Sequence, residues 1–223
     1  MSVAHTLRGV PLFAQLGDEE LGRLAGAARE RTYPKNSVIV FEDDPGDALY
    51  LVADGQVKVV LIGEDGREVI LAVLAEGDFF GEMSLIDDEP RSAHVIAMDD
   101  ARLLVLRRED FQRAMEEFPR IAFGLLRALS RRLRRADDKI GALVLLDVLG
   151  RVARILLELA DESGGDVITR RVTHHTIAQM IGSSRETVSR TIRELADRGL
   201  VEVTRKGIRV ADRTALRAAA KLS

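Results

Sequence analysis

The sequence of 223 residues contains no cysteine, and no apolar run in it approaches the roughly 20 residues that cross a bilayer. Without cysteine there are no disulfides, iron–sulfur clusters or thiolate zinc sites, which agrees with a reducing cytoplasm. The N-terminus lacks the basic, apolar and small-residue succession of a secretory signal, because Arg8 is followed by Asp18, Glu19 and Glu20. We therefore expect a cytoplasmic protein without a membrane partner.

Each half of the chain is poor in charge of one sign. Residues 1–118 contain 12 Lys and Arg against 24 Asp and Glu, a net charge of −12. Residues 119–223 contain 21 against 12, a net charge of +9, so the overall charge of −3 hides a strong asymmetry. A solvated face explains a single run of charges but not this difference between halves. The basic half has the charge expected for a nucleic-acid partner.

The acidic half has the pattern of an antiparallel β domain. Apolar runs predict strands over residues 37–41, 48–53, 56–62, 68–74, 94–98 and 101–107. Turns that contain Gly, Asp or Pro separate these strands, which indicates a sandwich or barrel. No βαβ alternation is present, so a Rossmann domain is not expected.

Residues 119–146 are the most regular helical segment. Apolar residues recur in it at spacings of four and three: Ala122, Leu126, Leu129, Leu133, Ala136, Ile140 and Leu143. This stripe can pack on the chain's own β domain, but its persistence over about three heptads favours the seam of a homodimer. Asp147 restarts the periodicity, and we expect a hinge near this residue.

The basic half contains two short predicted helices joined by a turn. Thr173 and Ser184 are suitable N-caps, and Gly182 supplies the turn, which is the signature of a helix-turn-helix. The polar residues of the second helix are Arg185, Glu186, Ser189, Arg190 and Arg193. Arginine can donate two hydrogen bonds to guanine, and glutamate can accept one from cytosine. We therefore expect this face to read double-stranded DNA.

A hairpin is predicted to follow the second helix. Its strands are residues 200–204 and 208–210, and its turn holds Arg205 and Lys206. In a wing of this kind, the two basic side chains and Arg209 would contact phosphates. The alternative is a three-helix scaffold with a solvated basic surface.

Residues 77–93 have the chemistry of an anion pocket inside the predicted barrel. Gly81 lets the backbone approach a ligand, and the helical turn after it offers free N–H groups. Arg91 supplies a forked cation for a phosphate, and Glu82 can accept a hydrogen bond from a sugar hydroxyl. The alternative is a surface ion pair between Glu82 and Arg91, worth little. The candidate ligand-binding residues here are Gly81, Glu82, Met83, Ser84, Arg91 and Ser92.

In combination these motifs resemble the cyclic AMP receptor protein/FNR superfamily of bacterial regulators, and most of all its cyclic AMP receptor protein branch. The resemblance covers nearly the whole chain, from VPLF at 10–13 through the pocket to LLDVLGR at 145–151 and GSSRETVSR at 182–190. It implies an α+β protein that is not an enzyme. The implied domains are a cyclic-nucleotide-binding β-barrel of jelly-roll type (1–118), a dimerisation helix (119–146) and a winged helix-turn-helix domain (147–223).

The resemblance also implies roles for residues. Gly81 and Glu82 would bind the ribose of cyclic AMP, and Arg91 and Ser92 its phosphate. Arg185, Glu186 and Arg190 would read a palindrome with TGTGA-like half-sites, with RNA polymerase as a further partner. Iron–sulfur sensing of the FNR type fails without cysteine. Haem sensing is not expected either. The sequence has only four histidines, His5, His94, His174 and His175, and the last two lie in the predicted DNA reader.

One pair of residues departs from the family pattern. The family's cyclic AMP receptors carry a Thr-Ser pair on the long helix that contacts adenine, where this chain has Ala136 and Asp137. A carboxylate can accept from the adenine amino group or from the paired N–H donors of guanine, which makes cyclic GMP a rival effector. Otherwise Asp137 faces solvent or pairs with an arginine of residues 131–135. A ligand-independent regulator, or a nucleotide-binding module that docks on protein or membrane, remains an alternative.

Overall fold

The computed structural model describes residues 2–168, 172–204 and 207–221. The chain forms two compact units, which divide in the sequence between Leu133 and Arg134. Each unit has its own hydrophobic core, and each is described below by itself. Within the described residues, no helix is both long and apolar enough to cross a membrane.

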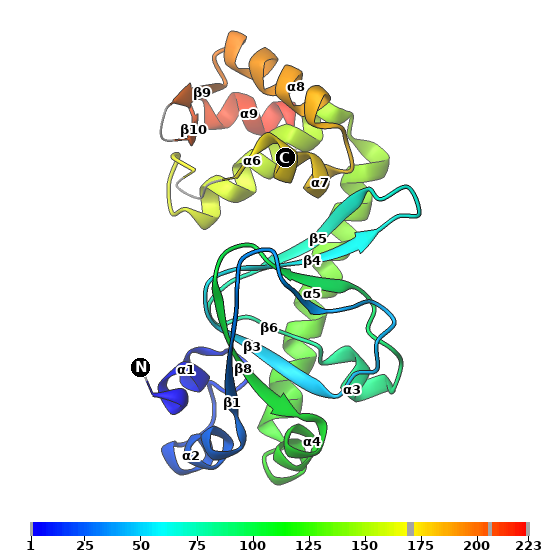
Figure 1. Cartoon of the computed structure of the whole chain (residues 1–223). Helices are drawn as coiled ribbons and strands as arrows, with labels where there is room; N and C mark the ends of the chain where they lie inside the picture. The colour runs from blue at the N-terminus through cyan, green and yellow to red at the C-terminus, as the bar shows by residue number, and fades with distance from the viewer. Residues whose placement is uncertain (1, 169–171, 205–206, 222–223) are drawn as a thin grey trace. The chain divides into compact units, whose positions relative to one another are not determined.

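Two four-stranded antiparallel sheets form the centre of the first unit (Figure 1). The strand order is β1-β8-β3-β6 in one sheet and β2-β7-β4-β5 in the other. The strands are β1 (Arg29–Tyr33), β2 (Val38–Val40), β3 (Ala48–Asp54), β4 (Val57–Ile62), β5 (Glu68–Leu74), β6 (Phe79–Phe80), β7 (His94–Ala97) and β8 (Ala101–Arg107). The helices are α1 (Val3–Gly9), α2 (Asp18–Ala27), α3 (Met83–Asp87), α4 (Arg108–Glu117) and the first part of α5 (Arg120–Leu145). The predicted β domain is thereby confirmed.

Strand β3 is apolar at successive positions, and the packing on its two faces explains why. Tyr50 and Val52 point between the two sheets, where they join one core cluster. Leu49 and Leu51 point to the opposite face and pack in a second cluster with helical residues such as Phe111. Because both faces of the strand are buried, the usual alternation of apolar and polar residues is absent.

The sequence patterns did not predict four elements: β1, β6, α1 and a C-terminal helix, α9 (Arg213–Ala219). Strand β1 reads Arg-Glu-Arg-Thr-Tyr, and four of its five residues are exposed. It is a strand because it pairs with β8, from Arg29 opposite Val105 to Tyr33 opposite Ala101. Tertiary pairing therefore overrides the polar composition.

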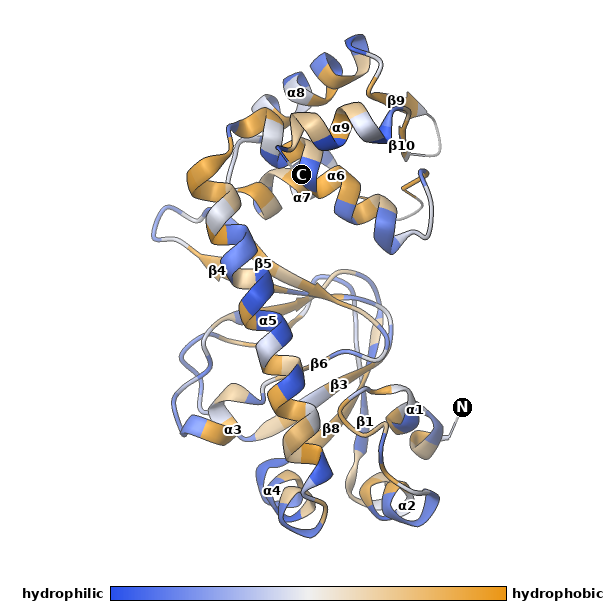
Figure 2. Cartoon of the chain, turned by 180° about the vertical axis from the view of Figure 1, so that it is seen from behind, coloured by the Kyte–Doolittle hydropathy of each residue, from blue (hydrophilic) through white to orange (hydrophobic). Residues whose placement is uncertain are grey.

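Helix α5 confirms the long helix expected between residues 119 and 146. Near its start, Ile121 and Leu125 are buried in the core of the first unit. Further along, Leu126, Leu133 and Ile140 are exposed by 60%, 64% and 60%. Apolar and polar residues alternate along the helix in Figure 2. The stripe therefore does not pack wholly on the chain's own β domain.

The second unit contains the last part of α5 and a compact helical domain. Its further elements are α6 (Val148–Glu162), α7 (His174–Ile181), α8 (Arg185–Asp197), β9 (Val201–Thr204), β10 (Gly207–Val210) and α9. Strands β9 and β10 pair as an antiparallel hairpin, which confirms the predicted one. Asp147 caps α6, because its side chain accepts a hydrogen bond from the Gly150 N–H at 2.8 Å. The helical register therefore restarts at Asp147, as the periodicity predicted.

Candidate functional site

Arg91 lies inside the first unit, with only 5% of its surface exposed. Its Nη1 donates to the Gly81 carbonyl at 2.7 Å, and its Nη2 donates to the Ala48 carbonyl at 2.8 Å. Its backbone exchanges hydrogen bonds of 2.9 Å with Asp43 and Asp44. Side chain and main chain are therefore both held, and the guanidinium is fixed before any ligand arrives.

Among the described residues, Arg91 has one ion-pair partner, and that partner is exposed. Asp47 lies 3.6 Å from Nη2, but its own side chain is 84% exposed. Burial lowers the pKa of Arg91 from its usual value, because the charged form loses hydration. The guanidinium also lies 5.8 Å from the centroid of the Tyr50 ring, which stacks on Phe80. A buried, half-compensated cation of this kind attracts an anion.

Gly81 is required here for two reasons. Its φ of +87° lies in the left-handed region that glycine adopts most readily. A Cβ at this position would lie 2.5 Å from Nη1 of Arg91 and 2.9 Å from the Ala48 carbonyl. A larger residue would therefore strain the backbone and displace the guanidinium.

Glu82 is buried as deeply as Arg91, with 2% of its surface exposed. It forms an ion pair with Arg132 of α5, so the predicted alternative of a surface ion pair between Glu82 and Arg91 is wrong. Its Oε2 has no hydrogen-bond partner in the described structure. A buried carboxylate oxygen without a partner is costly, and a ligand hydroxyl would satisfy it.

Arg132 is the residue of this site that the sequence patterns missed. It also donates to the Phe79 carbonyl, and its guanidinium lies 4.6 Å from the centroid of the Phe79 ring. In the sequence it belongs to a run of arginines on a predicted helix, 50 residues from Glu82. No local pattern distinguishes it from its neighbours, because only the fold brings α5 against this pocket.

The other predicted pocket residues lie on α3 or near Arg91. Ser84 is 3% exposed, whereas Met83 is 47% exposed. Ser92 is also exposed, and its Oγ lies 4.0 Å from the Met83 sulfur. The structure therefore brings Met83 and Ser92 together at the surface beside α3 and places the Ser84 side chain inside.

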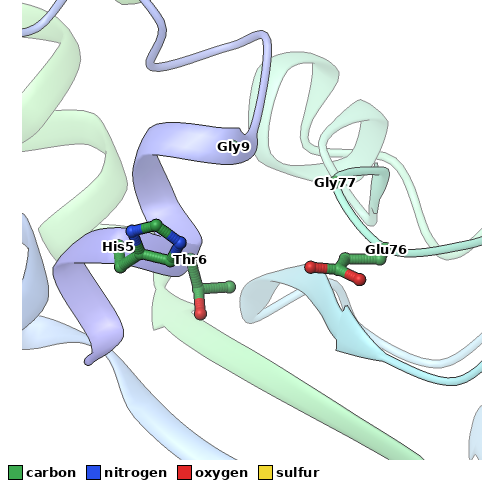
Figure 3. A pocket seen from close by; sticks show the side chains of 5 residues that line it. All are labelled: His5, Thr6, Gly9, Glu76 and Gly77. Carbon is green, nitrogen blue, oxygen red and sulfur yellow. The ribbon is translucent and has the colours of Figure 1, made fainter. Parts of the chain in front are cut away.

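A different hollow of about 260 Å³ lies between α1 and the turn before β6. Figure 3 shows His5 and Thr6 on α1 and Glu76 across from them. Gly9 and Gly77 complete the lining. None of these residues was predicted to bind a ligand. Across the described residues, no group of three or more His, Cys, Asp or Glu side chains is arranged to hold a metal ion.

Ala136 and Asp137 both lie on α5 in the second unit, and both are exposed. In the described part of the chain, no ion pair joins Asp137 to an arginine of the preceding turn. Its neighbour Asp138 lies 3.9 Å from Arg154 of α6. The Asp137 carboxylate is therefore available to a ligand or to solvent.

The helix-turn-helix has the predicted caps. The Thr173 hydroxyl accepts from the Thr176 N–H, and the Ser184 hydroxyl accepts from the Thr187 N–H, both at 3.1 Å. Gly182 ends α7 with a φ of +63°. On α8, the residues of the inner face are buried: Val188, Ile192 and Leu195. The caps and this inner face together determine which side of α8 faces outward.

The outward face of α8 carries the predicted DNA-reading residues. Arg185, Glu186, Arg190 and Arg193 are exposed, and Ser189 is half-buried. None of these three arginines forms an ion pair within the described residues, so their donors are free for a partner. A backbone hydrogen bond at the start of α8 and the Ser184 hydroxyl lower the pKa of Glu186, so this side chain stays an ionised acceptor.

Within the described part of the hairpin after α8, an ion pair joins the two strands. Arg209 donates to both carboxylate oxygens of Glu202, at 2.6 and 3.1 Å. Contact of Arg209 with a phosphate would therefore compete with this pair. Arg205 and Lys206, the predicted phosphate contacts, lie outside the described residues.

Comparison with known proteins gives matches to both parts of the chain. Residues 30–118 match the model of the cyclic nucleotide-binding domain, and residues 150–219 match the Crp-like helix-turn-helix domain. A cyclic AMP receptor protein of Thermus thermophilus is 40% identical over 197 residues, which cover 88% of this chain and 90% of the relative. A CRP-like cAMP-activated global transcriptional regulator of Mycobacterium tuberculosis is 35% identical over 185 residues, covering 81% and 83%.

A solved structure supports the same fold. The c-di-GMP responsive global regulator CLP of Xanthomonas campestris is 27% identical and aligns with a TM-score of 0.77. The alignment covers 87% of this chain and 99% of that regulator. The two-part architecture is therefore shared along nearly the full length of both proteins.

Gly81→Ala should destabilise the chain more than Gly66→Ala does. Both glycines have positive φ, but a Cβ at Gly66 would meet nothing within 4 Å. We expect a loss of about 1 kcal/mol at Gly66 from backbone strain, and at least about 1 kcal/mol more at Gly81 from the clash with Arg91 and Ala48. Urea unfolding of the native chain and of the two variants measures the loss in free energy of unfolding at each position. Equal losses would show that the pocket accommodates the methyl group and that the close approach is not needed.

Proposed function

Because the chain belongs to the family of Crp-like, cyclic nucleotide-responsive transcription regulators, we propose that it acts as a homodimer that binds specific DNA in response to cyclic AMP. The observation that carries this proposal is the pair of buried charges at the pocket. Arg91 donates to two carbonyl groups and, among the described residues, forms an ion pair only with the exposed Asp47, while Glu82 keeps one oxygen without a partner there. A phosphate beside a ribose hydroxyl satisfies both.

The proposal also assigns a role to each predicted site residue. Gly81 and Glu82 hold the ribose, Arg91 and Ser92 hold the phosphate, and Met83 and Ser84 complete the pocket. Ala136 and Asp137 face the base, and the α8 residues read TGTGA-like half-sites. The regulator works in the cytoplasm, where its DNA is, with RNA polymerase as a partner. It uses no metal, haem or iron–sulfur cofactor, and the lack of cysteine in the sequence supports the last of these.

Cyclic GMP is a second candidate effector. Asp137 is exposed and can accept from the adjacent N1–H and N2–H donors of guanine, whereas an adenine offers a single amino group. The names of the curated relatives support cyclic AMP. The regulator from Xanthomonas campestris is named as responsive to c-di-GMP, so a ligand test should include that compound.

The proposed response passes through the junction of α5 and α6. At this junction Arg151 donates to the Leu146 carbonyl at 3.2 Å, Asp147 caps α6, and Arg154 of α6 lies 3.9 Å from Asp138 of α5. A ligand that binds the DNA-competent arrangement more tightly shifts the population towards it. In that arrangement the two α8 helices of the dimer lie one DNA turn apart, about 34 Å.

A docking module for protein or membrane is the competing function from another class. The Arg131–Arg135 run is the feature that favours it. Against it, Arg132 pairs inward with Glu82 rather than facing a partner. The exposed arginines of α8 also share their face with Glu186, an acidic group that an anionic membrane would repel.

Arg91→Ala should abolish nucleotide binding while the chain still folds. We expect the affinity for cyclic AMP to fall by at least about a hundredfold, because the phosphate loses a forked, buried donor. Titration calorimetry with cyclic AMP, cyclic GMP and c-di-GMP measures binding and identifies the effector. Arg113→Ala, at a surface position of α4, is the control. Unchanged nucleotide-dependent DNA affinity in the Arg91 variant would refute the assignment.

Arg190→Ala should relax sequence preference as well as weaken binding. The loss of a bidentate base contact costs about 1–3 kcal/mol on the specific site and far less on random DNA. Fluorescence anisotropy with both DNAs at one salt concentration measures the difference. Arg198→Ala removes an exposed arginine that pairs with Glu194, and serves as the control. An equal loss on both DNAs would mean that Arg190 contacts only phosphate.

Leu133→Asp should convert the dimer to monomers, because it buries a charge in the apolar seam. Val203→Asp is a matched control, since Val203 is an apolar residue of similar exposure, 59% against 64%, on β9. Sedimentation velocity over a range of concentrations measures the oligomeric state. A Leu133 variant that remains dimeric would exclude α5 as the seam.

A further inference from the structure

Arg108 is the first residue of α4, and its side chain is 23% exposed. Its Nε and Nη2 donate to the Gly46 carbonyl at 3.2 and 2.7 Å. The same Nη2 donates to the Ser84 carbonyl at 2.8 Å, and Nη1 pairs with Asp88. All three nitrogens of this guanidinium are therefore engaged inside the first unit.

These contacts join the two segments that surround Arg91. Segment 43–48 holds Arg91 through its backbone, by the Asp44 carbonyl at 2.9 Å and the Ala48 carbonyl at 2.8 Å. Helix α3 begins directly after Glu82 and ends before Asp88. Arg108 thus connects the segment that positions the cation to the helix that positions the carboxylate.

The two segments also touch each other closely. A Cβ at Gly46 would lie 2.1 Å from the Ser84 Cβ, so they can approach this closely only because residue 46 has no side chain. Ser84 is 3% exposed and cannot move outward without opening this contact. The separation of segment 43–48 from α3 is therefore determined by Gly46 on one side and by the Arg108 bridge on the other.

Arg108 adds a second positive charge beside Arg91. Burial is the main cause that lowers the pKa of Arg91, and the charge of Arg108 contributes to the same shift. Bringing two guanidinium groups together is unfavourable unless carbonyl groups and a carboxylate compensate them, as Gly46, Ser84 and Asp88 do here. The engaged donors leave Arg108 suited to hold the protein rather than the ligand.

We propose that Arg108 is a positioning residue of the nucleotide pocket. It sets the gap between segment 43–48 and α3 before the ligand binds, so that Arg91 and Glu82 meet the ligand in a geometry already formed. A pocket formed in advance binds more tightly, because no ordering of its walls is needed on binding. This inference rests on the proposed binding of a cyclic nucleotide.

Two substitutions separate position from charge. Arg108→Gln removes both the charge and the fork, whereas Arg108→Lys keeps the charge but cannot bridge two carbonyls and Asp88 at once. Arg107→Gln is the control, since Arg107 is the adjacent arginine and is exposed. We expect the dissociation constant for cyclic AMP to rise about tenfold to a hundredfold in both Arg108 variants and to change by less than about twofold in the control.

Calorimetry on the full chain measures these constants, and DNA binding at saturating cyclic AMP gives a second readout. A positioning role predicts the same DNA affinity as the native chain once the pocket is filled. A lysine variant that binds like the native chain would show that only the charge matters and would overturn the proposal. A loss of DNA affinity at saturation would overturn it as well, since Arg108 would then transmit the signal.

Hydrogen exchange on the ligand-free proteins tests the inference without any nucleotide. Amides of segment 43–48 and of α3 should exchange faster in Arg108→Gln than in the native chain, and unchanged exchange would contradict the proposal. If the native chain binds no cyclic nucleotide, the proposed function fails, while this exchange result still decides whether Arg108 positions the two segments.

Gly46→Ala disturbs the same contact without touching Arg108, and it serves if the Arg108 variants do not fold. Its methyl group must push segment 43–48 away from Ser84, so we expect weaker binding of cyclic AMP, again by about tenfold or more. Native affinity in a folded Gly46→Ala protein would show that the spacing of the two segments does not control binding.

Discussion

The geometry of the pocket in the first unit depends on one buried cation, the guanidinium of Arg91, which donates to two backbone carbonyls. Taking a charge out of water is unfavourable, and a fold accepts it only where hydrogen bonds compensate part of the loss. The carbonyls of Gly81 and Ala48 supply those bonds without neutralising the charge. The site therefore stays electrostatically ready for an anion, and the neighbouring backbone must keep the fork in place.

The need to keep the Arg91 guanidinium in place explains the identity of several residues that lie far apart in the sequence. Gly81 has no side chain because a Cβ would collide with the fork, and Gly46 has none because α3 approaches it. Arg108 bridges the same two segments from the base of α4. Glu82 forms an ion pair with Arg132, and this contact links the pocket to the long helix. A ligand at Arg91 and Glu82 thus contacts groups that are each tied to a different element.

Helix α5 serves two purposes along its length. Ile121 and Leu125 of its first turns are buried in the core of the first unit, and Arg132 pairs with Glu82 at the pocket. The apolar residues Leu126, Leu133 and Ile140 remain exposed. An exposed apolar stripe of this regularity is unfavourable in water, which supports a second copy as its partner. In the second unit the exposed basic face of α8 is positioned by caps and by the buried inner face of the same helix.

The α+β class, most strands of the first unit, the long helix and the helix-turn-helix follow from the sequence alone, because they depend on local periodicity, caps and turns. Thr173, Gly182 and Ser184 act within a few residues of where they stand, so their roles were readable. The three-dimensional fold was needed to show that polar β1 is a strand, that Glu82 pairs with Arg132, and that Arg108 joins Gly46 to Ser84. Those contacts connect residues tens of positions apart, and their free energy comes from burial and pairing that no local pattern encodes.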